Sequence, residues 1–450
     1  AKLKRWLYGM RGAAHGWEME WQQQFRSEGY EMGKSAPTVM KHESKDIRCV
    51  VHGDDFTFIG PEDELKDIAK KMGEWYSIKM RGIIGPERHD LKKIDILNRT
   101  VEWDIERGIV YRADRKHVQI IAKDMGIEMS SNGVDVPGAK AEAEDPENDV
   151  ALVGAEATKF RAIAARANYL ALDRPDIQFS TKEICRSTSA PKQSDWVKLK
   201  RLARYLVKHP EIELVFDGFG LYDRIVVYVD ADWAGCKKTR KSTSGGMVTL
   251  ASTCLKTWSS TQGTVALSSG ESELYAVVKG AAEGAGMQSL MMDLGWQVSL
   301  VLRTDSSPAK AISWRRGIGK VRHLDVRYLW VQQRLNDKLM HIEKVKGAVN
   351  PANILTKYCN ASEVAENCKF IGVHFGENAN LNVLLFNLCS FRKHEFQATR
   401  TRTRWPKGMA VVQRSAKETP QDCADVAKPK RVRWADMLSD DGEDDEIDGK

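Results

Sequence analysis

Five acidic residues in the second half of the chain have the types and spacing that a metal-dependent hydrolase needs. Asp230 and Asp232 are two residues apart in a predicted strand, so their side chains should share one face. Glu271 and Glu273 open a predicted helix, where this spacing turns them about 200° apart, so only one can face a common site. Asp305 ends another predicted strand, a favoured place for catalytic groups in α/β sheets. Together such carboxylates could hold two Mg²⁺ ions around a phosphate, although each alone could be a surface acid or a helix cap.

A second pair of carboxylates, Asp54 and Asp55, lies between two short strands predicted within residues 47–60. Adjacent negative charges on a tight hairpin repel each other and raise each other's pKa, and a divalent cation with oxygen ligands relieves this repulsion. A solvated Asp-Asp turn of a β-hairpin gives the same pattern. This segment alone leaves both interpretations open.

Length and composition exclude several classes of protein. The 450 residues predict about three domains at ~150 residues each. The 42% apolar and 29% charged residues are typical of a globular chain rather than a disordered or fibrous one. No run approaches the ~20 apolar residues that cross a bilayer, so no membrane association is expected. The eight cysteines form no C-x-x-C pair, which argues against a zinc site or a disulfide framework and predicts an intracellular setting.

The distribution of charge indicates a polyanionic partner. The last twelve residues carry −6 while the whole chain carries +7, so the rest of the chain carries +13. Nucleic acid is the simplest partner for such a basic body, and an ordinary basic protein with an acidic tail is the alternative. The amino-terminus lacks an initiator Met and a secretory signal, so we interpret the chain as a fragment.

The hydrophobic periodicity predicts an α/β protein in four parts. The parts are residues 1–137 with a helix over 3–25, a linker and helical connection over 138–222, an α/β domain over 223–358, and an extension over 359–450 that is largely disordered after about 390. Two helices are expected in the connection, over 158–172 and 195–209. The α/β domain should contain, in order, strands 224–232, 246–251 and 255–259, helix 271–294, strand 299–304, helices 308–316 and 323–336, and strand 340–345.

Eleven phrases, taken in order, resemble a known family. They are LKRWLYGMRGAAHGW (3–17), HGDD (52–55), SIKMRGIIG (77–85), FRAIAARANYLALDRPDI (160–177), WVKLKRLARYL (196–206), DADWAG (230–235), RKSTSGGMV (240–248), WSSTQGTVALSSGESELYA (258–276), TDSSPAKAI (304–312) and RHLDVRYLWVQQRL (322–335), with NPANILTK (350–357) after them. The series is similar to the copia-type (Ty/copia superfamily) retrotransposon Pol polyprotein. The resemblance implies the C-terminal part of a reverse-transcriptase palm and thumb, followed by an RNase H-like domain with a mixed five-stranded sheet and flanking helices.

This resemblance implies a ribonuclease H that cleaves the RNA strand of an RNA/DNA hybrid with two Mg²⁺ or Mn²⁺ ions. Position by position, it assigns Asp230 as the central metal ligand, with Glu273 and Asp305 as the others. The fourth carboxylate of the family falls on Asn353, whose amide brings no negative charge.

The resemblance also implies that Asp54 and Asp55 are metal-binding carboxylates of polymerisation. The third polymerase carboxylate of the family lies in an upstream motif that this chain does not contain, Gly12 replaces a Gln of the nucleotide pocket, and His52-Gly53 replace Tyr-Val. The polymerase part is therefore expected to be incomplete. The remaining parts of the polyprotein are expected partners, in a cytoplasmic particle or the nucleus.

Clustered basic residues near Trp233 and Trp314 suit a hybrid that is recognised through its shape, phosphates and 2′-hydroxyls. A solvated charged face is the alternative. The residues expected to bind nucleic acid are Lys4, Arg5, Arg11, Lys198, Lys200, Arg201, Arg204, Lys237, Lys238, Arg240, Lys241, Arg315, Arg316, Lys320 and Arg322.

Three further hypotheses remain open. His323 could assist proton transfer or, as we favour, cap its helix. Residues Arg431–Trp434 resemble a docking motif for protein phosphatase 1, although we favour a self-neutralising disordered tail as their explanation. A catalytically inactive relic that only binds nucleic acid is the rival to the nuclease, favoured by Asn353, the altered hairpin and the missing upstream Asp.

Overall fold

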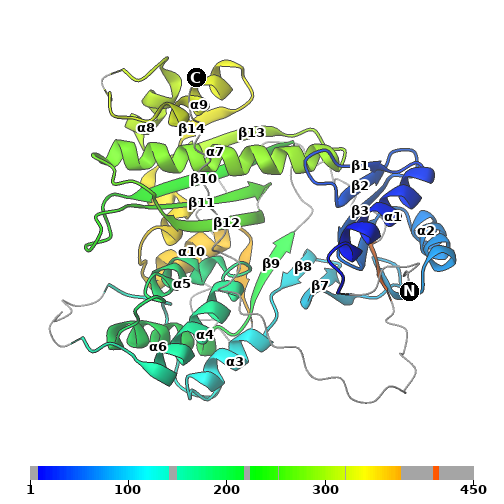
Figure 1. The fold of residues 1–450 in the computed structure, drawn as a ribbon, viewed down its shortest axis with the longest axis horizontal. Helices are drawn as coiled ribbons and strands as arrows, with labels where there is room; N and C mark the ends of the chain where they lie inside the picture. The colour runs from blue at the N-terminus through cyan, green and yellow to red at the C-terminus, as the bar shows by residue number, and fades with distance from the viewer. Residues whose placement is uncertain are drawn as a thin grey trace, which may run out of the picture. The chain divides into compact units, whose positions relative to one another are not determined.

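The computed structural model describes residues 9–140, 149–216, 223–251, 253–319, 321–376 and 409–414, and every structural statement below concerns these residues. They form three β-sheets with helices packed against them (Figure 1). The fold class is therefore mixed α/β, as predicted. Among the described helices, none is both long and apolar enough to cross a membrane.

The first sheet has six strands in the order β1-β2-β3-β4-β16-β5. Its strands are β1 (Glu31–Met32), β2 (Val39–His42), β3 (Ile47–His52), β4 (Asp55–Ile59), β5 (Ile78–Ile84) and β16 (Met409–Arg414). Burial alternates along β3 and β4, so one face of the sheet is apolar. Helices α1 (Ala13–Ser27) and α2 (Glu62–Trp75) share a buried cluster with that face, which contains Trp21, Phe25 and Phe56.

The second sheet is antiparallel, with five strands in the order β15-β9-β8-β7-β6. Its strands are β6 (Lys93–Ile96), β7 (Arg99–Asp104), β8 (Gly108–Arg112), β9 (Ile212–Phe216) and β15 (Val373–Phe375). A separate core joins the helices between β8 and β9, which are α3 (Lys116–Asp124), α4 (Gly154–Leu170), η1 (Pro175–Ile177), α5 (Gln178–Cys185) and α6 (Gln193–Lys208).

The third sheet is mixed, in the order β12-β11-β10-β13-β14. Its strands are β10 (Arg224–Asp232), β11 (Thr243–Leu250), β12 (Thr253–Thr261), β13 (Ser299–Thr304) and β14 (His341–Lys344). The first three strands along the chain pair antiparallel, whereas β13 runs parallel to both β10 and β14. Because both faces of this sheet are covered, β10 is buried over six consecutive residues instead of alternating.

The long helix α7 (Ser269–Asp293) lies across one face of the third sheet (Figure 1). Two of its glycines let it approach closely: a Cβ on Gly280 would lie 2.4 Å from Val229, and one on Gly284 would lie 2.6 Å from Leu300. The chain around this face also includes α8 (Ser307–Trp314), η2 (Val326–Leu329) and α9 (Trp330–Asn336). The other face packs against η4 (Pro351–Leu355), which follows η3 (Gly347–Val349), and against α10 (Ala361–Phe370).

The observed elements differ from the predicted ones mainly at their ends. The predicted strands 224–232 and 299–304 match β10 and β13, and helix 271–294 is α7 shifted by one or two residues. The predicted helix over 323–336 is wrong in its first turns, because Asp325 caps η2 and only α9 is α-helical.

Two predictions concern the ends of the chain. In the predicted helix 3–25 the described part begins with turns, and α1 starts at Ala13, while residues 1–8 lie outside the described range. Within the extension that is expected to be largely disordered after about 390, residues 409–414 form β16. The acidic linker stretch 141–148 and the tail from 415 lie outside the described residues.

A buried ion pair holds the helical core together. The Arg174 guanidinium donates to Asp176 at 2.7 and 2.9 Å, both side chains are at most 1% exposed, and the Tyr205 hydroxyl of α6 donates to Asp176 at 2.9 Å. Burial alone would raise the pKa of Asp176, but the Arg174 charge and these hydrogen bonds outweigh burial and lower it. The pair therefore joins the end of α4 to α6 without leaving an unpaired charge in the core.

Removing one member of this pair should destabilise the fold strongly. We expect Asp176→Asn to lower the free energy of unfolding by about 3–5 kcal/mol, because the Arg174 charge is left buried and unpaired. Urea unfolding measures the loss. Asp223→Asn, which breaks the exposed pair with Arg224, is the matched control and should cost under ~1 kcal/mol. Equal effects of the two substitutions would contradict the role given to burial.

Candidate active site

Three carboxylates converge at the carboxyl ends of β10 and β13. Asp230, Glu273 and Asp305 each offer an oxygen, and these three oxygens lie within 4.8 Å of one another. Strand pairing explains two of them: Val229 of β10 is in register with Thr304 of parallel β13, so the next residue of each chain is acidic and emerges at the same edge. Glu273 comes from the first turns of α7.

The start of α7 decides which glutamate joins this cluster. The Ser268 hydroxyl caps the helix by accepting a hydrogen bond from the Glu271 N–H, which fixes the rotation of the first turn. Glu271 then turns away from the cluster and pairs with Tyr275 and His323 instead. Of the two glutamates, Glu273 is the one that lies beside Asp230 and Asp305, and its role as a metal ligand stays a prediction.

The cluster is largely removed from water. Asp230 is 5% exposed, and its Oδ2 accepts a hydrogen bond from the Thr356 hydroxyl. Glu273 Oε1 accepts from the Ala231 N–H at 3.3 Å, whereas Glu273 Oε2 is buried without a hydrogen-bond partner. A buried carboxylate oxygen with no donor is costly unless the group is protonated or a cation binds it.

The protonation of the cluster reflects this crowding. Burial, together with the charges of Asp230 and Asp305, raises the pKa of Glu273 to about 9. Burial and Asp230 also raise the pKa of Asp305, against the opposing effect of Lys357 and Lys344. Hard divalent cations bind such grouped carboxylate oxygens and remove the repulsion between them. The residues present therefore fit a divalent metal site.

A short segment after β14 packs beside the carboxylate cluster. Gly347 approaches Asp305 so closely that a Cβ would lie 2.9 Å from its Oδ2. The Asn353 side chain donates to the Gly347 carbonyl at 2.7 Å, and the Asn350 side chain donates to the Val229 carbonyl at 2.9 Å. Asn353 Oδ1 is buried and has no hydrogen-bond partner. Sequence reasoning placed Asn353 near the site, and η4 does bring it beside Thr356 and Gly347.

Asp232 does not belong to this group of three potential metal ligands. Its carboxylate accepts a hydrogen bond from the Thr243 N–H at the β10–β11 junction, and burial raises its pKa. Two residues further along β10 than Asp230, Asp232 therefore contacts β11 and not the cluster.

Asp54 and Asp55 lie where the hairpin alternative placed them. Gly53 with φ +62° and Asp54 form the turn between β3 and β4, and Asp55 pairs with His52. In the described part of the chain, neither aspartate belongs to a group of three potential metal ligands. Their role in polymerisation stays a prediction.

The predicted nucleic-acid-binding residues are distributed over several elements. Lys200, Lys237, Lys238, Arg240, Arg316 and Arg322 are exposed, as is Arg11. Others are engaged within the chain: Lys198 pairs with Asp195, Arg204 donates to the Asn132 carbonyl at 3.2 Å, and Arg315 donates to Ile318. Arg201 and Lys241 are partly buried. Lys4, Arg5, Lys320 and the docking motif Arg431–Trp434 lie outside the described residues.

Sequence reasoning missed the network around Glu271. His323 Nε2 lies 2.9 Å from Glu271 Oε2, and the Leu267 N–H donates to the same oxygen at 2.9 Å. The favoured helix-cap role for His323 is wrong, because Asp325 is the cap. The i,i+4 spacing of Glu271 and Tyr275 was a usable signal, whereas no local pattern points from His323 to Glu271.

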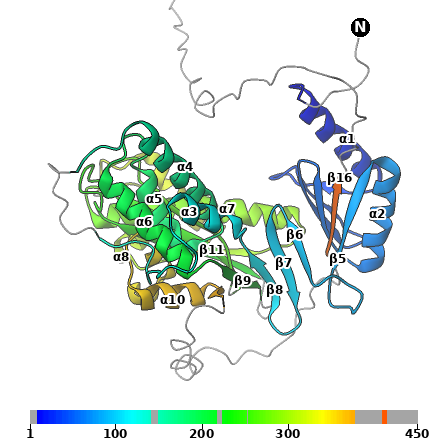
Figure 2. The ribbon, with the colours of Figure 1, turned by 90° about the horizontal axis from the view of Figure 1, so that it is seen from below.

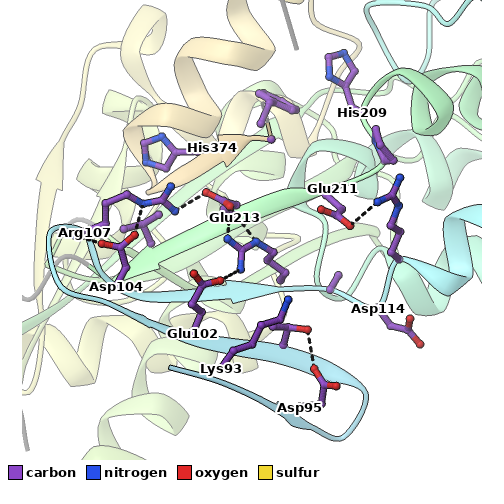
Figure 3. A pocket seen from close by; sticks show the side chains of 18 of the residues that line it. Lys93, Asp95, Glu102, Asp104, Arg107, Asp114, His209, Glu211, Glu213 and His374 are labelled. Atoms are coloured by element: carbon purple, nitrogen blue, oxygen red, sulfur yellow. Dashed lines mark hydrogen bonds and ion pairs between the residues drawn. The ribbon is translucent and has the colours of Figure 1, made fainter. Parts of the chain in front are cut away.

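A groove of about 1540 Å³ lies elsewhere, over the second sheet (Figure 3). Its charged side chains mostly neutralise one another: Arg107 pairs with Asp104 and Glu213, and Arg112 pairs with Glu102 and Glu213. None of the three clustered carboxylates lines it.

Comparison with known proteins places these observations in context. No protein-family model matches the chain. The retrovirus-related Pol polyprotein from transposon TNT 1-94 of Nicotiana tabacum is 27% identical over 387 residues, which cover 83% of this chain and 28% of that protein. The retrovirus-related Pol polyprotein from transposon RE1 of Arabidopsis thaliana is 23% identical over 378 residues, covering 83% of this chain and 25% of that protein.

A solved structure is also similar. The N-terminal RNase H domain of a Mycobacterium tuberculosis protein, fused to maltose binding protein, matches 32% of this chain and 96% of that chain, at 17% identity and a TM-score of 0.22. The chain spans about a quarter of the length of the two transposon proteins. Over most of its residues the chain is homologous to retrovirus-related Pol polyproteins from plant transposons.

Proposed function

We propose that the third sheet and its helices form a metal-dependent nuclease of the ribonuclease H type, which cleaves the RNA strand of an RNA/DNA hybrid. The observation that carries this proposal is the convergence of Asp230, Glu273 and Asp305 from three separate elements. Homology to transposon Pol polyproteins supports the same assignment. Two divalent ions, Mg²⁺ or Mn²⁺, would supply activation of water and neutralisation of charge on the phosphate.

The side chains of this chain have distinct tasks in the proposal. Asp230, the most buried of the three, is held by the Thr356 hydroxyl, and Glu273 is held by the Ala231 N–H. These contacts fix both carboxylates before substrate binds, so little reorganisation is needed. Gly347 leaves room beside Asp305 that any side chain would fill.

Exposed groups around the cluster suit a nucleic-acid duplex. Trp233 is 54% exposed and Trp314 is 49% exposed, and exposed Lys237, Lys238 and Arg240 follow Trp233 along the chain. Flat aromatic faces and unpaired cations are the groups that contact sugars and phosphates. Residues 9–85 retain the hairpin of the polymerase resemblance, but no polymerase activity is proposed for them.

A second candidate function is nucleic-acid binding without cleavage. Asn353 favours it, because an amide replaces the fourth carboxylate of the family and lowers the negative charge available to a cation. The experiments below separate the two functions.

Removing the central carboxylate should abolish cleavage. We expect Asp230→Asn to reduce Mg²⁺-dependent cutting of a labelled RNA/DNA hybrid by about 100-fold or more, while binding of the hybrid in EDTA is retained. Asp232→Asn, a carboxylate two residues away and outside the cluster, is the matched control and should retain most activity. Binding by the unaltered chain without any cutting would support the relic instead.

Metal binding should release a proton from Glu273. At pH 7 this group, with a pKa of about 9, is protonated in the metal-free protein and must ionise to bind a cation. Calorimetric titration with Mn²⁺ in buffers of different ionisation enthalpy should give about one proton per site for the native chain and close to none for Glu273→Gln. Without metal, the folded state binds this proton more tightly than the unfolded state, so stability should fall as pH rises from about 5 to 9. Glu273→Gln should flatten that slope.

Restoring a carboxylate at position 353 tests the rival function. We expect Asn353→Asp to tighten Mn²⁺ binding about tenfold and to raise cleavage, because the added charge lies where Oδ1 is now buried and unpartnered. Titration calorimetry and the hybrid assay provide the two measurements. If neither quantity changes, position 353 has no part in metal binding.

A further inference from the structure

Three side chains with metal-binding atoms converge beside β5, the last strand of the first sheet. Glu62 is the first residue of α2, and His89 and Asp90 lie in the loop that follows β5, which packs beside α2 (Figure 2). One ligand atom of each residue lies within 4.8 Å of the other two. We call these residues the Glu62–His89–Asp90 group. The group shares no residue with the carboxylate cluster of the third sheet.

The spacing of the ligand atoms fits a tetrahedral cation. His89 Nε2 lies 3.0 Å from Glu62 Oε1 and 3.7 Å from Asp90 Oδ1. Zn²⁺ binds imidazole nitrogen and carboxylate oxygen at about 2.0–2.2 Å, which places neighbouring ligands of a tetrahedron ~3.4 Å apart. Because the two observed distances lie on either side of that value, small side-chain movements bring the nitrogen and both oxygens to one ion.

Asp90 supplies a second, independent indication of a ligand. Its side chain is only 2% exposed. The Glu87 N–H donates to Asp90 Oδ2 at 2.9 Å, whereas no hydrogen bond of the described residues reaches Oδ1, since His89 Nε2 at 3.7 Å is too distant for one. A buried carboxylate oxygen without a donor is costly, and a cation between Asp90 and His89 would satisfy it.

The loop after β5 holds two of the ligands in place through its own backbone. The Leu91 N–H donates to the Ile83 carbonyl at 2.9 Å and thereby closes the loop. Lys92 Nζ donates to the Gly85 and Glu87 carbonyls at 2.9 and 2.6 Å. Two adjacent ligands in such a closed loop lose little further freedom when a cation binds, which favours binding.

The ligand types select the class of cation. Mg²⁺ and Ca²⁺ prefer oxygen ligands, whereas imidazole nitrogen suits Zn²⁺ and the neighbouring divalent transition metals. The His89 side chain is 67% exposed, so one side of the group is open to water, and a water molecule can complete the tetrahedron. No cysteine belongs to the group, so the spacing of the cysteines could not reveal it.

A lysine competes for one of the ligands. Lys66 Nζ, one turn further along α2, lies 2.5 Å from Glu62 Oε1, and the Lys66 side chain is 58% exposed. An exposed ion pair of this kind contributes little stability, so a divalent ion can displace the ammonium group into water. Removal of Lys66 should therefore affect metal binding in the opposite direction to removal of a ligand.

We propose that Glu62, His89 and Asp90 form a binding site for Zn²⁺ or a divalent transition metal of similar preference, with water as the fourth ligand. The bound ion fastens the loop after β5 to the first turn of α2. The inference is independent of the proposed nuclease, because it concerns another class of cation and residues of another sheet.

Cobalt spectroscopy and zinc titration on the full chain test the site. Every sample carries Asp230→Asn, so that the carboxylate cluster lacks its central ligand. Tetrahedral Co²⁺ absorbs visible light far more strongly than Co²⁺ in an octahedron of oxygen ligands, so we expect a strong cobalt band that Zn²⁺ abolishes at one ion per chain. His89→Gln should remove the band and weaken Zn²⁺ binding by at least about 100-fold, because even the loss of a group that only orients a ligand costs about 10- to 100-fold. His15→Gln, which removes an exposed histidine outside the group, is the matched control and should change neither quantity.

Removing the competing charge gives the second arm of the test. Lys66→Met should tighten Zn²⁺ binding about fivefold, because the ion no longer has to displace an ammonium group from Glu62. Lys70→Met removes an exposed lysine of the same helix that belongs to no ion pair of the described residues, and it should leave the affinity unchanged.

Hydrogen exchange separates the proposed site from binding elsewhere and from misfolding. Zn²⁺ should slow exchange of the amides of residues 87–91 except in His89→Gln, and the amides of Ile225–Val229 in β10 should exchange alike in every variant. The absence of a strong cobalt band, its persistence in His89→Gln, or weaker Zn²⁺ binding in Lys66→Met would each overturn the proposal.

Discussion

Repulsion among three carboxylates is the constraint on which the candidate site depends. Asp230, Glu273 and Asp305 have oxygens within 4.8 Å of one another in a largely buried place, which no flexible segment would maintain. Two parallel strands in fixed register supply the aspartates, and a 25-residue helix anchored by close glycine contacts supplies the glutamate. The rigidity of this sheet and helix therefore holds the three carboxylates together against their mutual repulsion.

The features that could be predicted are those that local hydrophobic patterns and helical or strand geometry determine. Strands β10 and β13 are covered on both faces, so their continuous apolar runs matched the predicted bounds. Helical rotation predicted that only one of Glu271 and Glu273 can face a common site, and the resemblance to the family selected Glu273. Strand alternation predicted a shared face for Asp230 and Asp232, but it could not reveal that Asp232 accepts a hydrogen bond from the neighbouring strand. Boundaries shifted wherever capping groups, such as Asp325, set the ends.

Contacts between segments that are far apart in the sequence could not be predicted from local sequence patterns. Thr356 reaches Asp230 across 126 positions, and His323 reaches Glu271 across 52. Neither partner can be inferred from periodicity or composition, since the topology of the sheet brings them together. Strand β16 is a further case: its six residues lie in a stretch of weak periodicity, yet they pair with both β4 and β5.

The amide at position 353 has a consequence for how η4 packs beside the carboxylate cluster. A fourth buried acid beside Asp230 and Asp305 would add repulsion to an already crowded cluster. With Asn353, less electrostatic repulsion opposes the packing of η4 onto the sheet. The packing of η4 against the sheet therefore does not depend on a bound cation to offset a fourth negative charge.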